Sequence, residues 1–236
     1  MPRKAMVLAA GLGKRMRPIT DSIPKPLVNI AGKSLLDHGL DALAEAGVSE
    51  AVVNIHYLGQ QIADHIGARS NPRVVVSDET ELLLDSAGGI VKALPLLGQQ
   101  PFVLLNADTF WIDGGGDELK RLALAWDDAS MDILLMLADP ANATGHSGST
   151  DFVRAEDGRL ARARGASHGF IYAGAGILHP RIFEGAALEP QSLNLYFDRA
   201  IVSGRLHGAV MTGHWITVGT PDAIPAAEAA VRRARL

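Results

Sequence analysis

A glycine-rich loop that carries three cations follows the first apolar run of the chain. It covers residues 11–20, with the sequence Gly-Leu-Gly-Lys-Arg-Met-Arg-Pro-Ile-Thr. Glycines let backbone N–H groups approach an anion closely, and the cations Lys14, Arg15 and Arg17 would neutralise its charge. A further lysine, Lys25, stands between two prolines shortly afterwards. The loop favours a ligand that carries phosphate, although a plain turn between a strand and a helix remains the alternative.

Three familiar phosphate-binding or nucleophile motifs do not fit this sequence. A dinucleotide-binding fingerprint needs a third glycine where Met16 stands. The triplet Gly32-Lys33-Ser34 resembles the end of a P-loop, but Leu27 occupies the position of the first P-loop glycine. Ser149 replaces the second glycine that a nucleophile elbow centred on Ser147 would need. A Rossmann dehydrogenase, a P-loop enzyme and a serine hydrolase are therefore disfavoured.

A carboxylate stands close behind a strongly apolar run. Asp108 follows residues 102–105, in the position where ligands gather at strand ends of open α/β sheets. Mg²⁺ prefers carboxylate oxygens and retains waters while it bridges substrate phosphates. The chain has no cysteine, so oxygen or imidazole must hold any metal, and the eight histidines show no metal-ligand spacing. Asp108 is the candidate metal ligand, with a simple Asx turn as the alternative.

Alternating strands and helices must position these side chains. Buried strands are predicted from five apolar runs, over residues 5–10, 51–55, 74–76, 102–105 and 133–138. The clearest helical pattern covers residues 34–46, with Leu36, Leu40 and Leu43 on one face and a capping box from Ser34 to Asp37. Such alternation predicts right-handed crossovers and a mostly parallel sheet of the α/β class.

The pattern changes after about residue 140. We expect a loop over 140–150, a hairpin around Asp157-Gly158 and a strand over 170–178. Helices are expected over 193–203 and 221–235, the latter with basic residues at its end. For this half we predict antiparallel structure inserted into a single domain that covers residues 1–236.

Composition excludes several classes of function. The chain has 236 residues, 47% of them apolar and 5% aromatic, with a formal net charge of -4. Few aromatics and a negative charge disfavour nucleic acid as a partner. No apolar stretch approaches the roughly 20 residues of a membrane span, and the N-terminal apolar run is too short for a secretory signal. We therefore expect a cytoplasmic protein with small-molecule substrates.

The continuation of the loop resembles a known family. Residues 8–20 together with Pro24-Lys25-Pro26-Leu27 closely resemble the start of the sugar-1-phosphate nucleotidyltransferases. The resemblance extends along the chain through the segments 77–79, 84–89, 104–108, 172–176 and 215–221. In detail the chain looks most like the short bacterial members that activate N-acetylmuramate 1-phosphate with UTP in peptidoglycan recycling. Mannose-1-phosphate guanylyltransferases are the neighbouring branch.

This resemblance implies a fold and an activity. The fold would be a Rossmann-like, mostly parallel mixed sheet flanked by helices, with a small antiparallel sugar-binding insertion. Its nucleotide-binding part would cover about residues 1–140 and its sugar-binding part about 141–236. The reaction joins a nucleoside triphosphate to a sugar 1-phosphate with release of pyrophosphate, with Mg²⁺ as cofactor. The enzyme would act as a monomer or a small homo-oligomer.

The resemblance also implies roles for individual residues. The catalytic residues would be Arg15 toward the triphosphate, Lys25 between the two phosphate groups, and Asp108 on the metal. Nucleotide-binding residues would be Ala10, Gly11, Gly13, Lys14, Glu79, Ala87, Gly88 and Asn106. Sugar-binding residues would be Asp151, Gly174, Asn142 and Tyr172, with His146 as a further candidate. Such contacts fit uracil, thymine or guanine equally well.

One position departs from the family. The closing segment usually presents an aspartate as the second metal ligand two positions before Gly-Thr-Pro, and here that residue is Thr217. A neutral hydroxyl binds Mg²⁺ less well than a carboxylate does, unless substrate phosphates complete the shell. A sensor that lost turnover is therefore an alternative, although Arg15, Lys25 and Asp108 together argue against it. The lactyl carboxylate of N-acetylmuramate would need a cation, for which Arg154, Arg162 and Arg164 are candidates.

Overall fold

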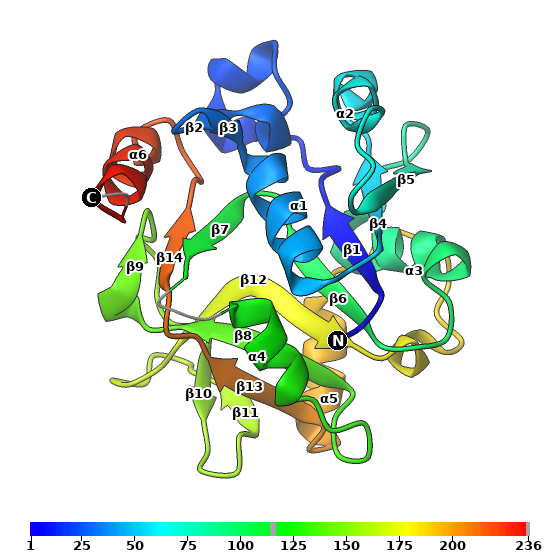
Figure 1. The fold of residues 1–236 in the computed structure, drawn as a ribbon. Helices are drawn as coiled ribbons and strands as arrows, with labels where there is room; N and C mark the ends of the chain where they lie inside the picture. Colours follow the sequence, from blue (N-terminus) through cyan, green and yellow to red (C-terminus); the bar gives the residue numbers. More distant parts are fainter. Residues whose placement is uncertain (114–116, 235–236) are drawn as a thin grey trace.

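The computed structural model describes residues 1–113 and 117–234, which form an α/β architecture around a seven-stranded sheet (Figure 1). The sheet has the order β13-β8-β12-β6-β1-β4-β5. Its strands are β1 (Lys4–Leu8), β4 (Glu50–Ile55), β5 (Arg73–Asp78), β6 (Phe102–Asn106), β8 (Ile133–Ala138), β12 (Ile171–Leu178) and β13 (Leu206–Val210). Of these, β12 runs antiparallel to both of its neighbours, while the other adjacent pairs are parallel. The prediction of a mostly parallel sheet is confirmed.

All five predicted strands exist, four of them with shifted ends. The first run was predicted over 5–10, but β1 ends at Leu8 because the next N–H, that of Ala9, bonds to the Asn54 side chain instead of to a strand. At the centre of the sheet Met6 pairs with Val52 and Leu104. These central strands are buried on both faces, which explains why their sequence is continuously apolar rather than alternating.

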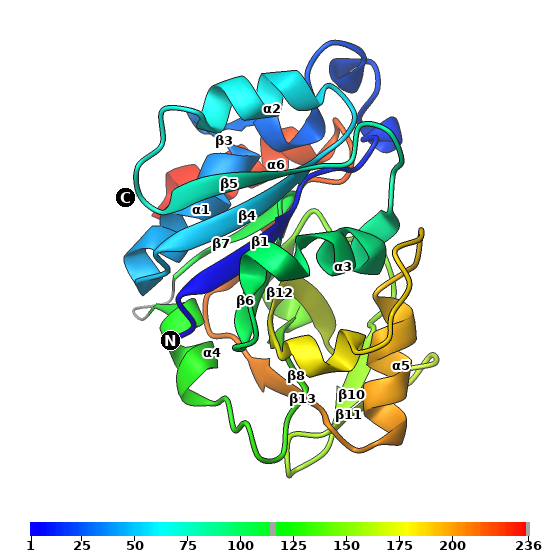
Figure 2. The ribbon, with the colours of Figure 1, turned by 90° about the vertical axis from the view of Figure 1, so that its right-hand side faces the viewer.

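Helices cover both faces of the sheet (Figure 2). One face carries α1 (Leu35–Ala46), α2 (Gly59–Ile66) and α4 (Glu118–Leu124). The other carries α3 (Asp85–Leu97) and α5 (Asn194–Val202). Two apolar cores result, one on each side of the sheet. Burial on both sides makes the sheet a rigid base for the loops at its ends.

The start of α1 confirms the predicted cap in part. The Ser34 hydroxyl accepts a hydrogen bond from the Asp37 N–H at 3.0 Å. In a full capping box the Asp37 carboxylate would also accept from the Ser34 backbone N–H. Here it accepts from the Ser34 hydroxyl instead, and it also pairs with Arg69 and His65. The helix ends at Gly47, whose φ of 91° is favourable only for glycine.

The second half of the chain only partly matches the predicted insertion. The hairpin at Asp157-Gly158 is confirmed as β10 (Phe152–Arg154) and β11 (Leu160–Arg162). However, β12 and β13 extend the central sheet instead of forming a separate part. The predicted loop over 140–150 contributes β9 (Ala143–Thr144) to a small sheet with β14 (His214–Thr217) and β7 (Thr109–Ile112). Long-range pairing of this kind leaves little local signal.

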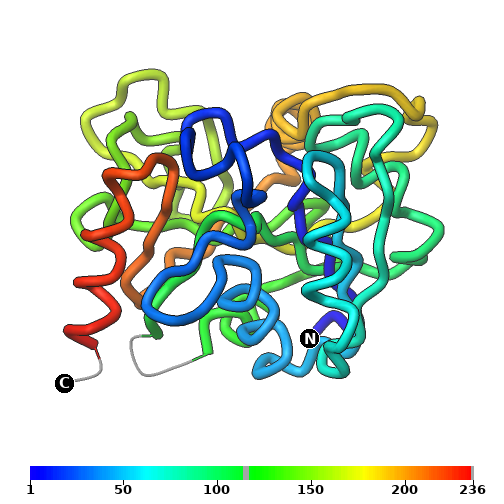
Figure 3. The backbone as a smooth tube through the Cα atoms, turned by 90° about the horizontal axis from the view of Figure 1, so that it is seen from above, coloured from blue at the N-terminus to red at the C-terminus, as the bar shows by residue number. Residues whose placement is uncertain are grey.

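The remaining elements are the connection between β1 and α1 and the last helix. Between β1 and α1 the chain forms three short turns and the hairpin β2 (Asn29–Ile30) and β3 (Lys33–Ser34). This connection lies between α6 (Ala223–Ala234) and α2 when the molecule is seen from above (Figure 3). Residue 235, the end of the predicted last helix, lies outside the described residues. Within the described ranges, no helix combines the length and apolarity that a membrane span requires.

Candidate functional site

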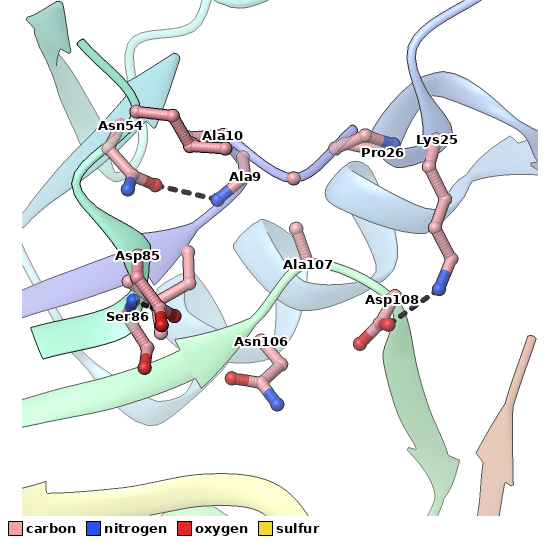
Figure 4. Close-up of a pocket in the computed structure, with 13 residues that line it drawn as sticks. Ala9, Ala10, Lys25, Pro26, Asn54, Asp85, Ser86, Asn106, Ala107 and Asp108 are labelled. Atoms are coloured by element: carbon pink, nitrogen blue, oxygen red, sulfur yellow. Dashed lines mark hydrogen bonds and ion pairs between the residues drawn. The ribbon is translucent and has the colours of Figure 1, made fainter. Parts of the chain in front are cut away.

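A cavity of about 440 Å³ opens at the carboxyl ends of β1, β4 and β6 (Figure 4). Its walls come from the end of β1 and the loop after it, the turn at Lys25, the end of β6 and the start of α3. The lining residues are Leu8, Ala9, Ala10, Gly11, Lys25, Pro26, Asn54, Leu83, Asp85, Ser86, Asn106, Ala107 and Asp108. The topology brings these segments together because neighbouring parallel strands end at the same edge of the sheet.

An ion pair joins two of the predicted catalytic residues at one end of the cavity. The Lys25 Nζ lies 2.6 Å from the Asp108 Oδ2. The lysine side chain is 12% exposed and the aspartate side chain 35%, so the pair is within reach of a ligand. The fold thus brings together two residues that are 83 positions apart in the sequence. An ammonium group and a carboxylate side by side can bind a phosphate and a metal cation, respectively.

The glycine-rich loop meets the closing segment of the chain. The Arg15 guanidinium is so close that a Cβ at Gly219 would lie 3.7 Å from its nitrogens. Gly13 has a φ of 61°, and its carbonyl accepts a hydrogen bond from the Thr20 hydroxyl at 2.9 Å. Ala10 and Gly11 line the cavity, whereas Gly13, Lys14 and Arg15 lie outside its lining. Lys14 and Arg15 are both exposed, so their side chains are free to move toward a ligand.

The backbone at Thr217 lies beside the backbone at Asp108. It pairs with Thr109 across β14 and β7, and the next N–H, that of Val218, donates to the Asp108 carbonyl at 3.2 Å. In the described ranges, no group of three or more acidic, histidine or cysteine side chains could hold a metal by itself. Two carboxylates line the cavity, that of Asp108, which is paired with Lys25, and that of Asp85.

A series of hydrogen bonds between buried polar groups lies next to the cavity. The Asn54 Oδ1 accepts from the Ala9 N–H at 2.7 Å, and the Asn54 Nδ2 donates to the Glu79 Oε1 at 2.7 Å. The other oxygen of Glu79 accepts from the Leu84 N–H at 3.1 Å. Asn54 and Glu79 are 2% and 1% exposed. These contacts tie the end of β1 to the start of α3, and sequence reasoning missed Asn54 although it is a polar residue in an apolar run.

Three residues predicted to contact the base are not part of the cavity lining. Glu79 is absent from the lining, and both of its oxygens bond to protein groups. The N–H groups of Ala87 and Gly88 donate to the Gln191 carbonyl at 2.9 and 3.2 Å. A Cβ at Gly88 would lie 2.3 Å from the Glu189 carbonyl oxygen, so the glycine permits this close approach. At this end the cavity is lined instead by Leu83, Asp85 and Ser86.

Three of the predicted sugar contacts lie on or beside β12: Gly174 packs against Asn106, and Tyr172 is hydrogen-bonded to Asp151. A Cβ at Gly174, whose φ is 75°, would lie 2.6 Å from the Thr109 Oγ1 and 3.2 Å from Asn106. The Asp151 Oδ2 accepts from the Tyr172 N–H at 2.8 Å. The Tyr172 hydroxyl is buried without a hydrogen-bond partner in the described residues. Burial raises the pKa of Tyr172, and the charges of Asp108 and Asp151 add to the effect, so the phenol remains a donor.

The other sugar candidates bond to the protein itself. The Asn142 side chain donates to the Gly213 carbonyl at 2.9 Å and pairs with His214 Nδ1 at 2.8 Å. Arg154 donates to the Gly208 carbonyl, and Arg162 bonds to Asp198. His146 is half-buried and its ring contacts the Ser149 carbonyl. Arg164 is exposed, in a turn with a φ of 43°.

Comparison with known proteins places this geometry in context. A family profile described as nucleotidyl transferase matches residues 4–146. An N-acetylmuramate alpha-1-phosphate uridylyltransferase of Caulobacter vibrioides is 42% identical, over 99% of this chain and 98% of the relative. A protein of the same name from Neisseria meningitidis is 35% identical, over 96% of this chain and 97% of the relative.

Solved structures show the same fold. A UDP-glucose pyrophosphorylase complexed with UDP-glucose superposes with a TM-score of 0.79 at 19% identity, covering 99% of each chain. HddC from Yersinia pseudotuberculosis complexed with GMP-PN gives a TM-score of 0.78 at 23% identity, covering 97% of this chain and 99% of HddC. The family match covers more than half of the chain, and the first two relatives cover nearly all of it. The chain therefore belongs to the nucleotidyl transferase family, as a sugar-1-phosphate nucleotidyltransferase.

Proposed function

We propose that this enzyme transfers a uridylyl group from UTP to N-acetylmuramate α-1-phosphate and releases pyrophosphate. The observation that carries the proposal is the pairing of Lys25 with Asp108 at one end of the cavity, inside the motifs of the family. The choice of base and sugar rests on the two relatives of that name, at 42% and 35% identity over nearly the full chain. Such an enzyme would serve peptidoglycan recycling in the cytoplasm, where UTP is made.

Charge neutralisation is the main task of the proposed site. In this reaction an oxygen of the sugar phosphate attacks the α-phosphorus of UTP in line with the departing pyrophosphate. Both reactants are anions, so catalysis depends on positioning and on cations rather than on a covalent nucleophile. We assign to Lys25 the contact between the two phosphate groups and to Arg15 a contact with the triphosphate. Lys14 would add positive charge at the entrance.

The residues present fit a magnesium ion that arrives with the nucleotide. Mg²⁺ is commonly held by one or two carboxylates together with substrate phosphates and waters. Asp108 would supply the carboxylate. Thr217 is near it in the fold, because the N–H of the next residue, Val218, donates to the Asp108 carbonyl. Bound there, the ion would neutralise charge on the reacting phosphates. The Lys25 ammonium, now on Asp108, would shift toward the phosphates.

The sugar would bind on the side of β12. Gly174 of β12 packs against Asn106, Tyr172 of the same strand bonds to Asp151, and the buried Tyr172 hydroxyl has a hydrogen to donate. Among the three arginines considered for the lactyl carboxylate, Arg154 and Arg162 already bond to protein groups. Arg164 is therefore the favoured partner. In this scheme residues 1–140 bind the nucleotide, and the sugar contacts come from beyond residue 140.

A pyrophosphate-release assay tests the proposal directly. The purified enzyme is given Mg²⁺ with each of UTP, dTTP, GTP and CTP, crossed with N-acetylmuramate, N-acetylglucosamine, glucose and mannose 1-phosphates. We expect the highest kcat/KM for UTP with N-acetylmuramate α-1-phosphate. A preference for GTP with mannose 1-phosphate would instead support the guanylyltransferase branch, to which several relatives at 27–28% identity belong by name. Nucleotide binding without turnover on any pair would support a sensor.

A further inference from the structure

Asp85 has a backbone conformation that is unusual for its residue type. It is the first residue of α3 and has a φ of 58°, in the left-handed region that side chains with a Cβ seldom adopt. Its neighbours hold it there. The Leu84 N–H bonds to the buried Glu79, and the Ser86 hydroxyl accepts from the Leu193 N–H at 2.9 Å. A strained residue that the surroundings maintain is often found at a binding site.

The Asp85 carboxylate lines the cavity without a cation beside it. Its residue is exposed, and the Oδ1 accepts a hydrogen bond from the Ser86 N–H at 2.5 Å. Among the described residues, no lysine, arginine or histidine lies within ion-pair distance of Asp85, whereas Asp108 is paired with Lys25. Asp85 therefore retains acceptor capacity that a ligand can use.

The cavity is consequently polarised. Lys25 and Asp108 lie together at one end, and Asp85 and Ser86 lie at the other (Figure 4). An unpaired carboxylate repels the triphosphate, while the lysine attracts it. A nucleotide in this cavity is thus oriented with its phosphates toward Lys25 and its nucleoside toward Asp85.

We propose that the Asp85 carboxylate is a specificity-determining group that accepts a hydrogen bond from the nucleoside of the substrate. Two donors have the required chemistry, an N–H of the base and a hydroxyl of the ribose. The inference rests on the proposed function, because it takes the ligand to be a nucleoside triphosphate. It adds a recognition residue at the end of the cavity where Ala87 and Gly88 are turned away from the ligand.

Calorimetric binding of UTP, with Mg²⁺ and without sugar phosphate, tests the inference apart from turnover. Asn tolerates the left-handed region well, so Asp85→Asn keeps the shape and removes the charge. We expect this variant to bind UTP about tenfold more weakly, because the neutral amide oxygen is a weaker acceptor than the carboxylate. Glu81→Gln, an exposed change in the same loop that is outside the cavity lining, should bind UTP like the wild type. Unchanged affinity in Asp85→Asn overturns the inference.

Substrate analogues distinguish the two donors. If the carboxylate accepts from a ribose hydroxyl, the wild type and Asp85→Asn will bind 2′-deoxy-UTP or 3′-deoxy-UTP equally well. If it accepts from the base, the two proteins will bind 3-methyl-UTP equally well. Either result supports the inference. A loss of the same size for UTP and all three analogues would show that Asp85 contacts neither donor, and would overturn it.

A glycine variant separates ligand binding from folding. Glycine adopts a φ of 58° without a Cβ clash, so Asp85→Gly should melt about 2 °C higher while it loses the same UTP affinity as Asp85→Asn. A lower Tm with unchanged UTP affinity would mean that the carboxylate serves the fold alone. Failure of the wild type to bind any nucleoside triphosphate would refute the proposed function itself, which is a different outcome from wild-type binding that Asp85→Asn leaves unchanged.

Discussion

The two ends of the cavity differ in how their residues are held. At one end Lys25 and Asp108 form an ion pair that a ligand can reach. Beneath the other end, which Asp85 and Ser86 line, Asn54 and Glu79 are almost fully buried and connect the end of β1 to the start of α3. The first arrangement exchanges partners easily because its groups are partly solvated, whereas the second is costly to disturb. Charge chemistry and positioning are thus assigned to separate sets of residues.

This difference predicts which property each substitution changes. At the ion-pair end, substitutions should reduce the rate and leave the fold stable, because the charges there act on substrate phosphates. At the buried end, substitutions should reduce stability, because they leave polar groups without partners. A substitution at the ion-pair end that lowered stability, or one at the buried end that lowered only the rate, would show that the two ends do not divide these roles.

The largest effect is expected from Asp108→Asn. The variant keeps the shape of the side chain and removes the negative charge that would hold the metal, so kcat should fall by about 10²–10³ with little change in Tm. The measurement is pyrophosphate release at saturating substrates. Asp222→Asn is a matched control, since Asp222 is exposed just before α6 and lies outside the cavity lining. Full activity of Asp108→Asn with Mg²⁺ would refute the metal assignment.

Lys25→Ala should have the next largest effect. Charge compensation matters most in the transition state, so kcat should fall by roughly 10², while the Kd for UTP changes much less. Steady-state kinetics and calorimetry together give both quantities. Lys33→Ala removes a lysine that pairs with Asp41 outside the cavity, and should have wild-type kinetics. If Lys25→Ala lost UTP affinity and kept kcat, the lysine would be a simple anchor.

Asn54→Ala examines the buried end. It leaves the Ala9 N–H and the Glu79 carboxylate without their partner, so the free energy of unfolding should fall by about 1–3 kcal/mol. Urea unfolding followed by circular dichroism measures this change. Lys25→Ala should lose less stability in the same experiment. A stability equal to that of the wild type would show that solvent or nearby groups readily replace Asn54.

Thr217→Asp sharpens the description of the ion-pair end. A second carboxylate beside Asp108 should tighten Mg²⁺ or Mn²⁺ binding by roughly tenfold. Electron paramagnetic resonance of Mn²⁺ measures this affinity without turnover. The wild type should bind Mn²⁺ weakly alone and more tightly with a non-hydrolysable UTP analogue. Equal Mn²⁺ affinity in the two proteins would place residue 217 away from the metal.

The smallest effect concerns pH and a region outside the cavity. His38 stacks on Phe110 at 4.1 Å between ring centroids, and burial lowers the pKa of His38 below its ordinary value of 6.5. The unfolded chain therefore takes up the proton first, and stability should fall as the pH drops below about 6.5. Melting curves at pH 7.5 and 5.5 measure the loss. His38→Gln should lose less Tm on acidification than the wild type.

Most of the framework is readable from the sequence, because it depends on local patterns. All five apolar runs became strands of the central sheet, and the heptad-like spacing of Leu36, Leu40 and Leu43 predicted α1. The resemblance to the family also assigned Lys25 and Asp108 to one site, and the structure pairs their side chains. These features can be recognised in the sequence because periodicity and motif spacing are properties of short segments.

Tertiary structure decided the parts that depend on contacts between distant segments. Ala87 and Gly88 are turned toward Gln191, a residue about a hundred positions away, and Asn142 bonds to the segment around His214. The supporting role of Asn54 exists only because β1, β4 and the start of α3 converge on it. No local pattern reveals which backbone group a polar side chain will meet. Burial and the choice of hydrogen-bond partners are therefore set by packing, and the end of the cavity lined by Asp85 and Ser86 became visible only in three dimensions.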